Sequence, residues 1–337
     1  MNSRKSKKQH SFERICFPAS PYMLLQYLLL SSIAEIQKTF FFFHDNICKS
    51  IREKFRNRYE INYFSCSVEK KALLLIYYLY LRWIKYRRWP FLIHAEYFIC
   101  DHLYWGWILG ADHDYSLLED GVGNYAVPLP PYHFSKWRYW LLCAIFWPFP
   151  YKSWGISPRC KRLYLAKELS KNSPLYEKET VPFNLEHLWQ NADIHKKKLI
   201  WNIFGIDSKL LSQLMHHSFY TLLLTQPLSE DRICTEQEKI AYYREIISLY
   251  GLTDIIIKNH PREKTDYRKY FPDTMILPVS VPMELLVLSG FALKQAVTIC
   301  STSVILLHGK CPIIWTGTEF SEHLRQQWGS IPKPDFL

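Results

Sequence analysis

The second half of the chain alternates between buried apolar runs and helical patterns. "FYTLLLTQP" (219–227) and "DIIIKNHP" (254–261) are short apolar runs that end in turn formers, as buried strands do. Between them, "TEQEKIAYYREIISLYG" (235–251) predicts a helix that begins with Thr235 and Glu238 in capping-box spacing. Further strands are predicted in "TMILPVS" and "AVTIC", and further helices in "VPMELLVLSG" and "STSVILL". This alternation predicts a parallel sheet with covering helices.

The first half of the chain is less regular. "RICF" (14–17), the turn "PASP" (18–21) and the apolar run after it predict a strand followed by a helix. A basic start before an apolar run is also typical of a secretory signal, but the two prolines and the lack of a small-residue cleavage site favour the strand and helix. The polar segment 167–198 predicts an interdomain connection with one embedded helix.

Two apolar segments, 72–89 and 139–154, are shorter than the roughly 20 residues that cross a bilayer. Trp, Tyr, Lys and Arg flank both segments, which is typical of a helix lying in the interface of an anionic membrane. A core helix whose basic ends reach solvent fits equally well. The basic residues concerned are Arg82, Lys85, Arg87, Arg88, Arg138 and Lys152.

Composition narrows the class of protein. A chain of 337 residues that is 48% hydrophobic has the size of two ordinary globular domains. A net charge of +11 with 16% aromatic residues indicates an anionic partner, which could be a nucleotide, a polyanion or a lipid surface. The nine cysteines include no CxxC pair, so neither a disulfide framework nor a zinc site is indicated, and a reducing compartment fits best.

Polar side chains follow three of the predicted elements. Lys258 and His260 come where a strand ends, with Pro261 stopping further pairing. The hydroxyls of Ser301, Thr302 and Ser303 stand at a predicted helix start, where they could hold a phosphate or serve only as a cap. Glu284 lies in a predicted first helical turn, where it could bind a ribose diol or only offset the helix dipole. A strand-end histidine is more often a structural hydrogen bonder.

An acidic pair stands in the first half of the chain. In "SLLEDGVGNY" (116–125), Glu119 and Asp120 follow an apolar run and precede Gly121 and Gly123. Adjacent carboxylates repel, so we expect Glu119 to have a raised pKa and Asp120 to accept backbone N–H bonds. The glycines permit a tight turn.

In this order the motifs resemble those of the bacterial sialyltransferases of glycosyltransferase family 52 and the related polysialyltransferases. Their acidic element resembles Glu119-Asp120-Gly121, their HP element His260-Pro261, and their hydroxyl element Ser301-Thr302-Ser303. The resemblance implies an α/β fold of GT-B type, with two Rossmann-like domains facing across a cleft. We expect an acceptor-side domain at 1–165, a connection at 166–198 and a CMP-sugar domain at 199–337.

The resemblance also implies roles for individual residues. Glu119 would be the general base, with Asp120 beside it and Gly121 and Gly123 shaping the loop. A protonated His260 would act on the leaving phosphate, while two of the three hydroxyls would bind that phosphate; Thr302 stands where relatives often have serine, so which two is open. Lys258 and Pro261 would lie in the donor site, with Lys258 near cytosine and Glu284 on the ribose.

The implied reaction is inverting transfer of sialic acid from CMP-sialic acid to a hydroxyl of a cell-surface glycan: lipooligosaccharide, O-antigen or capsule. No cofactor or metal is expected, although "DHD" at 112–114 imitates the DxD motif of metal-dependent transferases. We expect no nucleic-acid partner. We expect the protein to lie on the cytoplasmic side, at an anionic membrane surface. Whether it forms a homodimer is left open. The alternatives are another activated sugar as donor, or a non-catalytic basic protein that binds a polyanion or a membrane.

Overall fold

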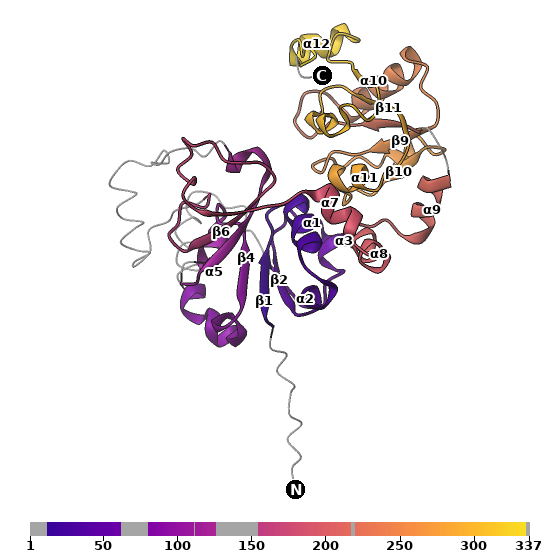
Figure 1. Cartoon of the computed structure of the whole chain (residues 1–337). Helices are drawn as coiled ribbons and strands as arrows, with labels where there is room; N and C mark the ends of the chain where they lie inside the picture. Colours follow the sequence, from indigo (N-terminus) through magenta and orange to yellow (C-terminus); the bar gives the residue numbers. More distant parts are fainter. Residues whose placement is uncertain (1–11, 62–79, 111, 126–153, 217–219, 335–337) are drawn as a thin grey trace. The chain divides into compact units, whose positions relative to one another are not determined.

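The computed structural model describes residues 12–61, 80–110, 112–125, 154–216 and 220–334. The chain forms two compact units, Met1–Ile200 and Trp201–Leu337, and Figure 1 shows a sheet with surrounding helices in each. The expected connection at 166–198 belongs to the first unit. It includes a strand, Glu179–Pro182, that pairs in the sheet of that unit. The strand is polar because three of its four side chains are exposed, which hid it in the sequence.

The first unit contains a seven-stranded parallel sheet with the order β3-β2-β1-β4-β5-β6-β7. The strands are β1 (Arg14–Phe17), β2 (Thr39–Phe43), β3 (Arg58–Glu60), β4 (Glu96–Ile99), β5 (Tyr115–Leu118), β6 (Cys160–Leu165) and β7 (Glu179–Pro182). The helices and 3₁₀ helices are α1 (Pro21–Leu30), α2 (Ile33–Gln37), α3 (Lys49–Arg52), η1 (Pro90–Ile93), α5 (Tyr104–Gly110), η2 (Gly121–Asn124), α7 (Leu185–Asn191) and α8 (Ile194–Ile203). The division between the units falls within α8.

The strand, turn and helix predicted near the start of the chain are confirmed as β1, the turn and α1. Ser20 caps α1 by accepting a hydrogen bond from the N–H of Met23, and Pro21 occupies the first helical position, where its missing N–H costs nothing. Seven of the ten residues of α1 are buried, so this helix belongs to the core of the unit.

The second unit contains a five-stranded parallel sheet with the order β10-β9-β8-β11-β12. The strands are β8 (Tyr220–Leu224), β9 (Ile255–Lys258), β10 (Met275–Leu277), β11 (Leu293–Thr298) and β12 (Ile313–Trp315). The helices and 3₁₀ helices are α9 (Ser208–His216), α10 (Glu236–Leu249), η3 (Tyr267–Lys269), α11 (Met283–Leu288), η4 (Thr302–Leu307) and α12 (Glu322–Trp328). The predicted alternation is confirmed, except that "STSVILL" forms a short 3₁₀ helix.

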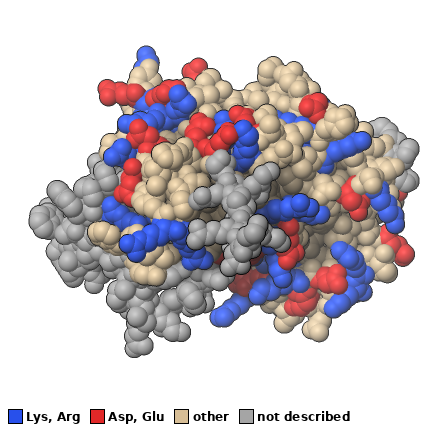
Figure 2. Space-filling view, turned by 90° about the horizontal axis from the view of Figure 1, so that it is seen from below, with Lys and Arg blue, Asp and Glu red and all other residues tan. Residues whose placement is uncertain are grey.

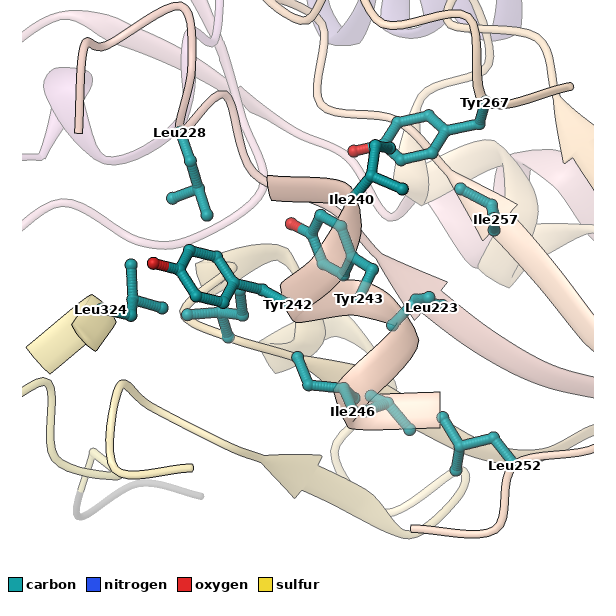
Figure 3. Close-up of a cluster of buried hydrophobic side chains, with 12 residues drawn as sticks. Leu223, Leu228, Ile240, Tyr242, Tyr243, Ile246, Leu252, Ile257, Tyr267 and Leu324 are labelled. Carbon is teal, nitrogen blue, oxygen red and sulfur yellow. The ribbon is translucent and has the colours of Figure 1, made fainter. Parts of the chain in front are cut away.

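Helix α10 packs one face of the second sheet through the core shown in Figure 3. Its capping box is present as predicted: the Thr235 hydroxyl accepts from the N–H of Glu238, whose carboxylate accepts from the N–H of Thr235. Tyr243 and Ile246 are fully buried against strand residues such as Ile257. This packing joins α10 to β8 and β9, whose ends carry the loops described below.

Each sheet has one point at which the strand order reverses. In the first sheet the reversal lies between β1 and β4, and in the second between β8 and β11. Parallel α/β sheets bind ligands beyond the carboxyl ends of the strands at such points. The loops after β1, β4, β8 and β11 are therefore expected to contribute to a ligand-binding site.

The aromatic-basic segment near residue 80 is partly buried, as the core-helix alternative expects. Residues 80–88 are helical, and Lys85 is buried, with its ammonium 2.6 Å from the carbonyl of Ile108 and 2.9 Å from Asp112. Arg82 also pairs with Asp112. These two cations are therefore engaged within the protein, whereas we expected them to supply charge at a membrane surface. Residues 72–79 and 139–153, with Arg138 and Lys152, lie outside the described residues. Among the helices that are described, none is long and apolar enough to cross a membrane.

Candidate active site

The acidic pair stands directly after β5. Glu119 is 5% exposed, and three donors reach its carboxylate: Tyr22 at 3.0 Å on Oε1, and on Oε2 Tyr125 and the N–H of Ala166, both at 2.6 Å. The donors come from α1, from the segment after η2 and from the end of β6, so Glu119 joins three parts of the first unit. An ionised carboxylate can be buried only with such partners.

Asp120 makes contacts other than the expected backbone bonds. Its Oδ1 accepts from the Ser20 hydroxyl at 3.0 Å, and its Oδ2 lies 3.3 Å from Nε2 of His102. Its side chain is a quarter exposed, whereas that of Glu119 is buried. The turn that follows needs its glycine, because Gly121 has a φ of +65°. Gly123 lies within η2.

His102 is a site residue that the sequence reasoning missed. It follows β4, and its ring stacks on that of Trp154 with centroids 4.4 Å apart and planes 7° apart. Because Ser20 follows β1, Asp120 brings together the two loops at the reversal point of the first sheet. The signal available in the sequence was a polar pair directly after an apolar run. Asp101-His102 has this pattern, and so has Asn259-His260, where it identified His260.

Asp101 holds the segment that carries Trp154. Its carboxylate accepts the backbone N–H groups of Trp154 at 2.7 Å and Gly155 at 2.9 Å, and the Tyr115 hydroxyl at 2.7 Å. Trp154 has a φ of 59°, a left-handed conformation that is unfavourable for a bulky residue. Burial raises the pKa of Asp101, while these donors act in the opposite direction. Backbone strain that is maintained by surrounding contacts is common at functional sites.

The "DHD" motif is engaged in ion pairs. Burial alone would raise the pKa of Asp112, yet Lys85 and Arg82 hold it below its ordinary value. Asp114 pairs with Arg159 at 3.2 Å. Within the described ranges, no group of three or more His, Cys, Asp or Glu side chains is arranged to hold a metal ion.

In the second unit, His260 follows β9 and its orientation is fixed from two sides. Its backbone N–H donates to Glu263 at 2.6 Å, and its ring Nδ1 accepts the N–H of Arg262 at 3.2 Å. Nε2 is then the ring atom that carries hydrogen in the neutral form. Burial, followed by the charges of Arg262 and Lys258, lowers the pKa of His260, so the protonated form that we expected is disfavoured in the free protein.

The hydroxyl motif follows β11, next to β8 at the reversal point of the second sheet. The N–H of Ser301 donates to Thr298 at 2.9 Å, and the hydroxyl oxygens of Ser301 and Ser303 lie 2.6 Å apart. Ser301 is buried and Thr302 is exposed. The structure thus pairs Ser301 with Ser303 and separates Thr302 from them.

Lys258 and Glu284 complete this edge of the second sheet. Lys258 is buried and donates to the carbonyl of Asn259 at 3.0 Å, immediately before His260 and Pro261. Glu284 stands in the first turn of α11, where burial raises its pKa and the charge of Lys258 acts in the opposite direction. The charge of Lys258 acts on Glu284, and α11 contacts η4, which contains Ser303. These polar groups are suited to binding a nucleotide.

Two solved structures show what this fold is. The chain is similar to a 2,6-sialyltransferase of Photobacterium sp., crystallised with CMP and lactose, at 12% identity and a TM-score of 0.53, covering 93% of this chain and 75% of the other. It is also similar to a UDP-GlcNAc 2-epimerase of Methanocaldococcus jannaschii, crystallised with UDP-GlcNAc and UDP, at 12% identity and a TM-score of 0.50, covering 94% and 93%. The protein has the GT-B fold.

The sequence then gives the family. The model of glycosyltransferase family 52 matches residues 42–316, so the chain belongs to that family and is a glycosyltransferase. An uncharacterized protein of Haemophilus influenzae is 30% identical over 313 residues, which cover 92% of this chain and 95% of that protein. The resemblance seen in the motifs is confirmed.

Proposed function

We propose that the protein transfers sialic acid from CMP-sialic acid to a hydroxyl of a cell-surface glycan, with inversion and without a metal ion. The observation that carries the proposal is the group of polar residues at the carboxyl ends of the second sheet's strands, in a family 52 glycosyltransferase. Lys258 ends β9 and His260 follows it, the Ser301–Ser303 hydroxyl pair follows β11, and Glu284 lies in the first turn of α11. The sialyltransferase of the same fold that was crystallised with CMP and lactose supports this donor class and a glycan acceptor.

On the donor side, the bond between the anomeric carbon of sialic acid and the phosphate oxygen breaks, and its electrons go to the phosphate. The N–H at Nε2 of His260 and the hydroxyls of Ser301 and Ser303 donate hydrogen bonds to the growing negative charge. Lys258 binds near cytosine, and Glu284 accepts from the ribose hydroxyls. Pro261 follows His260 and lies in the donor site, two residues beyond Asn259 in the loop after β9.

On the acceptor side, a base takes the proton of the attacking hydroxyl as its oxygen bonds to the anomeric carbon. We assign this role to Glu119. Among the described residues, one donor reaches Oε1 and two reach Oε2, so that part of the chain leaves a lone pair of Oε1 for the acceptor proton. Asp120 positions the adjoining loop through Ser20 and His102.

The direct test is incubation with CMP-sialic acid and a panel of galactose-, lactose- and sialyl-terminated acceptors, with products identified by mass spectrometry. Transfer to one acceptor class establishes the function and names the acceptor. No transfer from CMP-sialic acid, together with transfer from another activated sugar, would assign the site to that donor.

A non-catalytic protein that binds a polyanion is the second candidate, and the charge of +11 favours it. On the face drawn in Figure 2, however, Lys and Arg are interspersed with Asp and Glu and form no single basic patch. A melting experiment separates the two candidates. A ligand at 100 times its dissociation constant stabilises the native state by about 2.7 kcal/mol, so CMP raises the Tm of a CMP-sugar enzyme and leaves that of a polyanion binder unchanged.

We also propose that the protein is held at the inner face of the cytoplasmic membrane. Tyr80, Trp83 and Arg87 are spaced as one face of the helix at 80–88, and all three are exposed, Trp83 by 81%. Aromatic and basic side chains on one exposed face suit the interface of an anionic bilayer.

A further inference from the structure

The loop that carries His260 is tied to the loop that follows β8. Arg262 pairs with Asp231, its second nitrogen lying 2.9 Å from the carboxylate, and the N–H of Lys264 donates to Glu230 at 2.6 Å. Asn259 donates to the carbonyl of Thr265 at 3.3 Å, which closes the loop upon itself. The backbone around His260 is therefore held at several points.

Glu263 stands at the centre of these contacts, and its side chain is 0% exposed. Oε2 accepts the N–H of His260 at 2.6 Å and also the hydroxyl of Thr225, which directly follows β8. Oε1 accepts from Tyr267 at 2.7 Å and lies 3.7 Å from the ammonium of Lys239 on α10. Tyr267 belongs to the buried cluster drawn in Figure 3, together with Ile240.

Glu263 therefore acts on His260 through the main chain. Its carboxylate fixes the amide of His260, while the N–H of Arg262 fixes Nδ1 of the same residue, and together they determine where Nε2 points. Taking a carboxylate out of water is unfavourable, and here three donors and one ammonium offset that cost. An apolar side chain would fill the space but would leave the amide of His260 without an acceptor.

We propose that Glu263 is a positioning residue for His260, holding the imidazole at the distance and angle that the leaving phosphate requires. This inference rests on the proposed function. Glu263 binds no substrate itself; it joins the end of β8, the loop after β9 and α10 so that His260 is oriented before the donor binds. A misplacement of about 1 Å in such a group lowers turnover on the order of 100-fold.

The test compares E263Q with Y267F. Glutamine offers one oxygen and an NH₂ group to three donors and an ammonium, so the His260 contact weakens. Y267F removes only a donor to Oε1 and keeps the His260 contact, so it is the matched control. We expect kcat of E263Q to fall about 10- to 100-fold with little change in the KM for CMP-sialic acid, and Y267F to stay close to the wild type.

A second readout does not depend on turnover. In protein labelled with ¹⁵N-histidine, the backbone amide proton of His260 resonates downfield because its acceptor is a carboxylate, and H260Q assigns the signal. E263Q moves this signal upfield and Y267F does not. Should the wild type transfer no sialyl group, the proposed function fails, while this amide signal still tests the positioning role.

E263D serves as a second variant, because it keeps the charge for Lys239 and withdraws the carboxylate from His260. We expect the same loss of kcat as in E263Q. Equal losses in Y267F and E263Q, or an unchanged His260 amide in folded E263Q, would overturn the proposal. Failure of both Glu263 variants to fold would assign Glu263 to folding and reject the positioning role.

Discussion

At the scale of single residues, the two adjacent carboxylates differ in their surroundings. Glu119 is buried under two tyrosine hydroxyls and a backbone N–H, whereas Asp120 contacts Ser20 and His102 at a more open position. We expect E119Q to lower turnover by roughly 10²- to 10⁴-fold with CMP affinity nearly unchanged, because the base acts on the acceptor.

D120N is the paired variant for this measurement. It weakens the contact to His102 and is expected to disorder the loop between β1 and α1, which lowers Tm before it lowers turnover. Steady-state kinetics and CMP titration of both variants decide the assignment. A well-folded D120N without activity, together with an active E119Q, would mean that Asp120 is the base and that Glu119 positions the loop.

The titration of His260 is a second property of one residue. Its pKa is lowered by burial, then by the charges of Arg262 and Lys258, while Asp231 raises it. We therefore expect the imidazole in the free protein to titrate below 6.5, the ordinary value. R262Q removes a cation and leaves Asp231 uncompensated, so both changes shift the midpoint to higher pH. NMR titration of the ring signals measures this, and a wild-type midpoint at or above 6.5 would show that the surroundings act differently.

At the scale of elements, α10 carries a buried cation that holds two loops together. Lys239 is 0% exposed, and its ammonium lies 3.0 Å from Glu230, 3.2 Å from Glu236 and 3.7 Å from Glu263. K239M leaves these carboxylates without their cation. Breaking a buried ion pair costs about 3–5 kcal/mol, so we expect the free energy of unfolding of the second unit to fall by that amount in urea.

The control for K239M is R325M, which removes an exposed cation 3.4 Å from Glu319. Exposed pairs contribute about 0–1 kcal/mol, so R325M is expected to unfold almost as the wild type does. Equal midpoints for K239M and R325M would mean that the three carboxylates do not depend on Lys239.

Elements also show what could be read from the sequence. β9 and α10 were predictable because a buried apolar run and a capping box are local patterns. β7 was not, because an edge strand with exposed side chains has no apolar period. The polar residues after β4 could have marked His102 as a candidate, but its stacking on Trp154 and the burial of Lys85 depend on partners far along the chain, so no local pattern identifies these contacts. Likewise, the pairing of Ser301 with Ser303 rather than Thr302 follows from the backbone after β11 and not from the residue types.

At the scale of the whole molecule, the reaction is expected to proceed without a divalent cation. In the proposed mechanism His260 and the serine hydroxyls stabilise the leaving phosphate, and Asp112 is already engaged by Lys85 and Arg82. Activity should therefore be unchanged in excess EDTA, measured as transfer from CMP-sialic acid. Activity lost in EDTA and restored by magnesium or manganese would give the "DHD" motif a catalytic role.

The location of the protein is the second property of the whole chain. With Lys85 and Arg82 engaged inside the first unit, the proposed attachment to a membrane would depend on the exposed face of the helix at 80–88, formed by Tyr80, Trp83 and Arg87. We expect the protein to sediment with vesicles that contain phosphatidylglycerol at low ionic strength. Because salt screens the attraction of Arg87 to the lipid headgroups, high salt should release part of it.

W83A tests which side chain is responsible. Trp83 is 81% exposed, so its removal costs the fold little, yet it removes the largest apolar group of this face and should reduce vesicle binding severalfold. Tyr176, which is 50% exposed on the same unit, provides the control variant Y176A, for which binding should stay at the wild-type level. Equal binding by W83A and Y176A would place the membrane contact elsewhere, and a wild type that stays in solution at low salt would contradict the peripheral location itself.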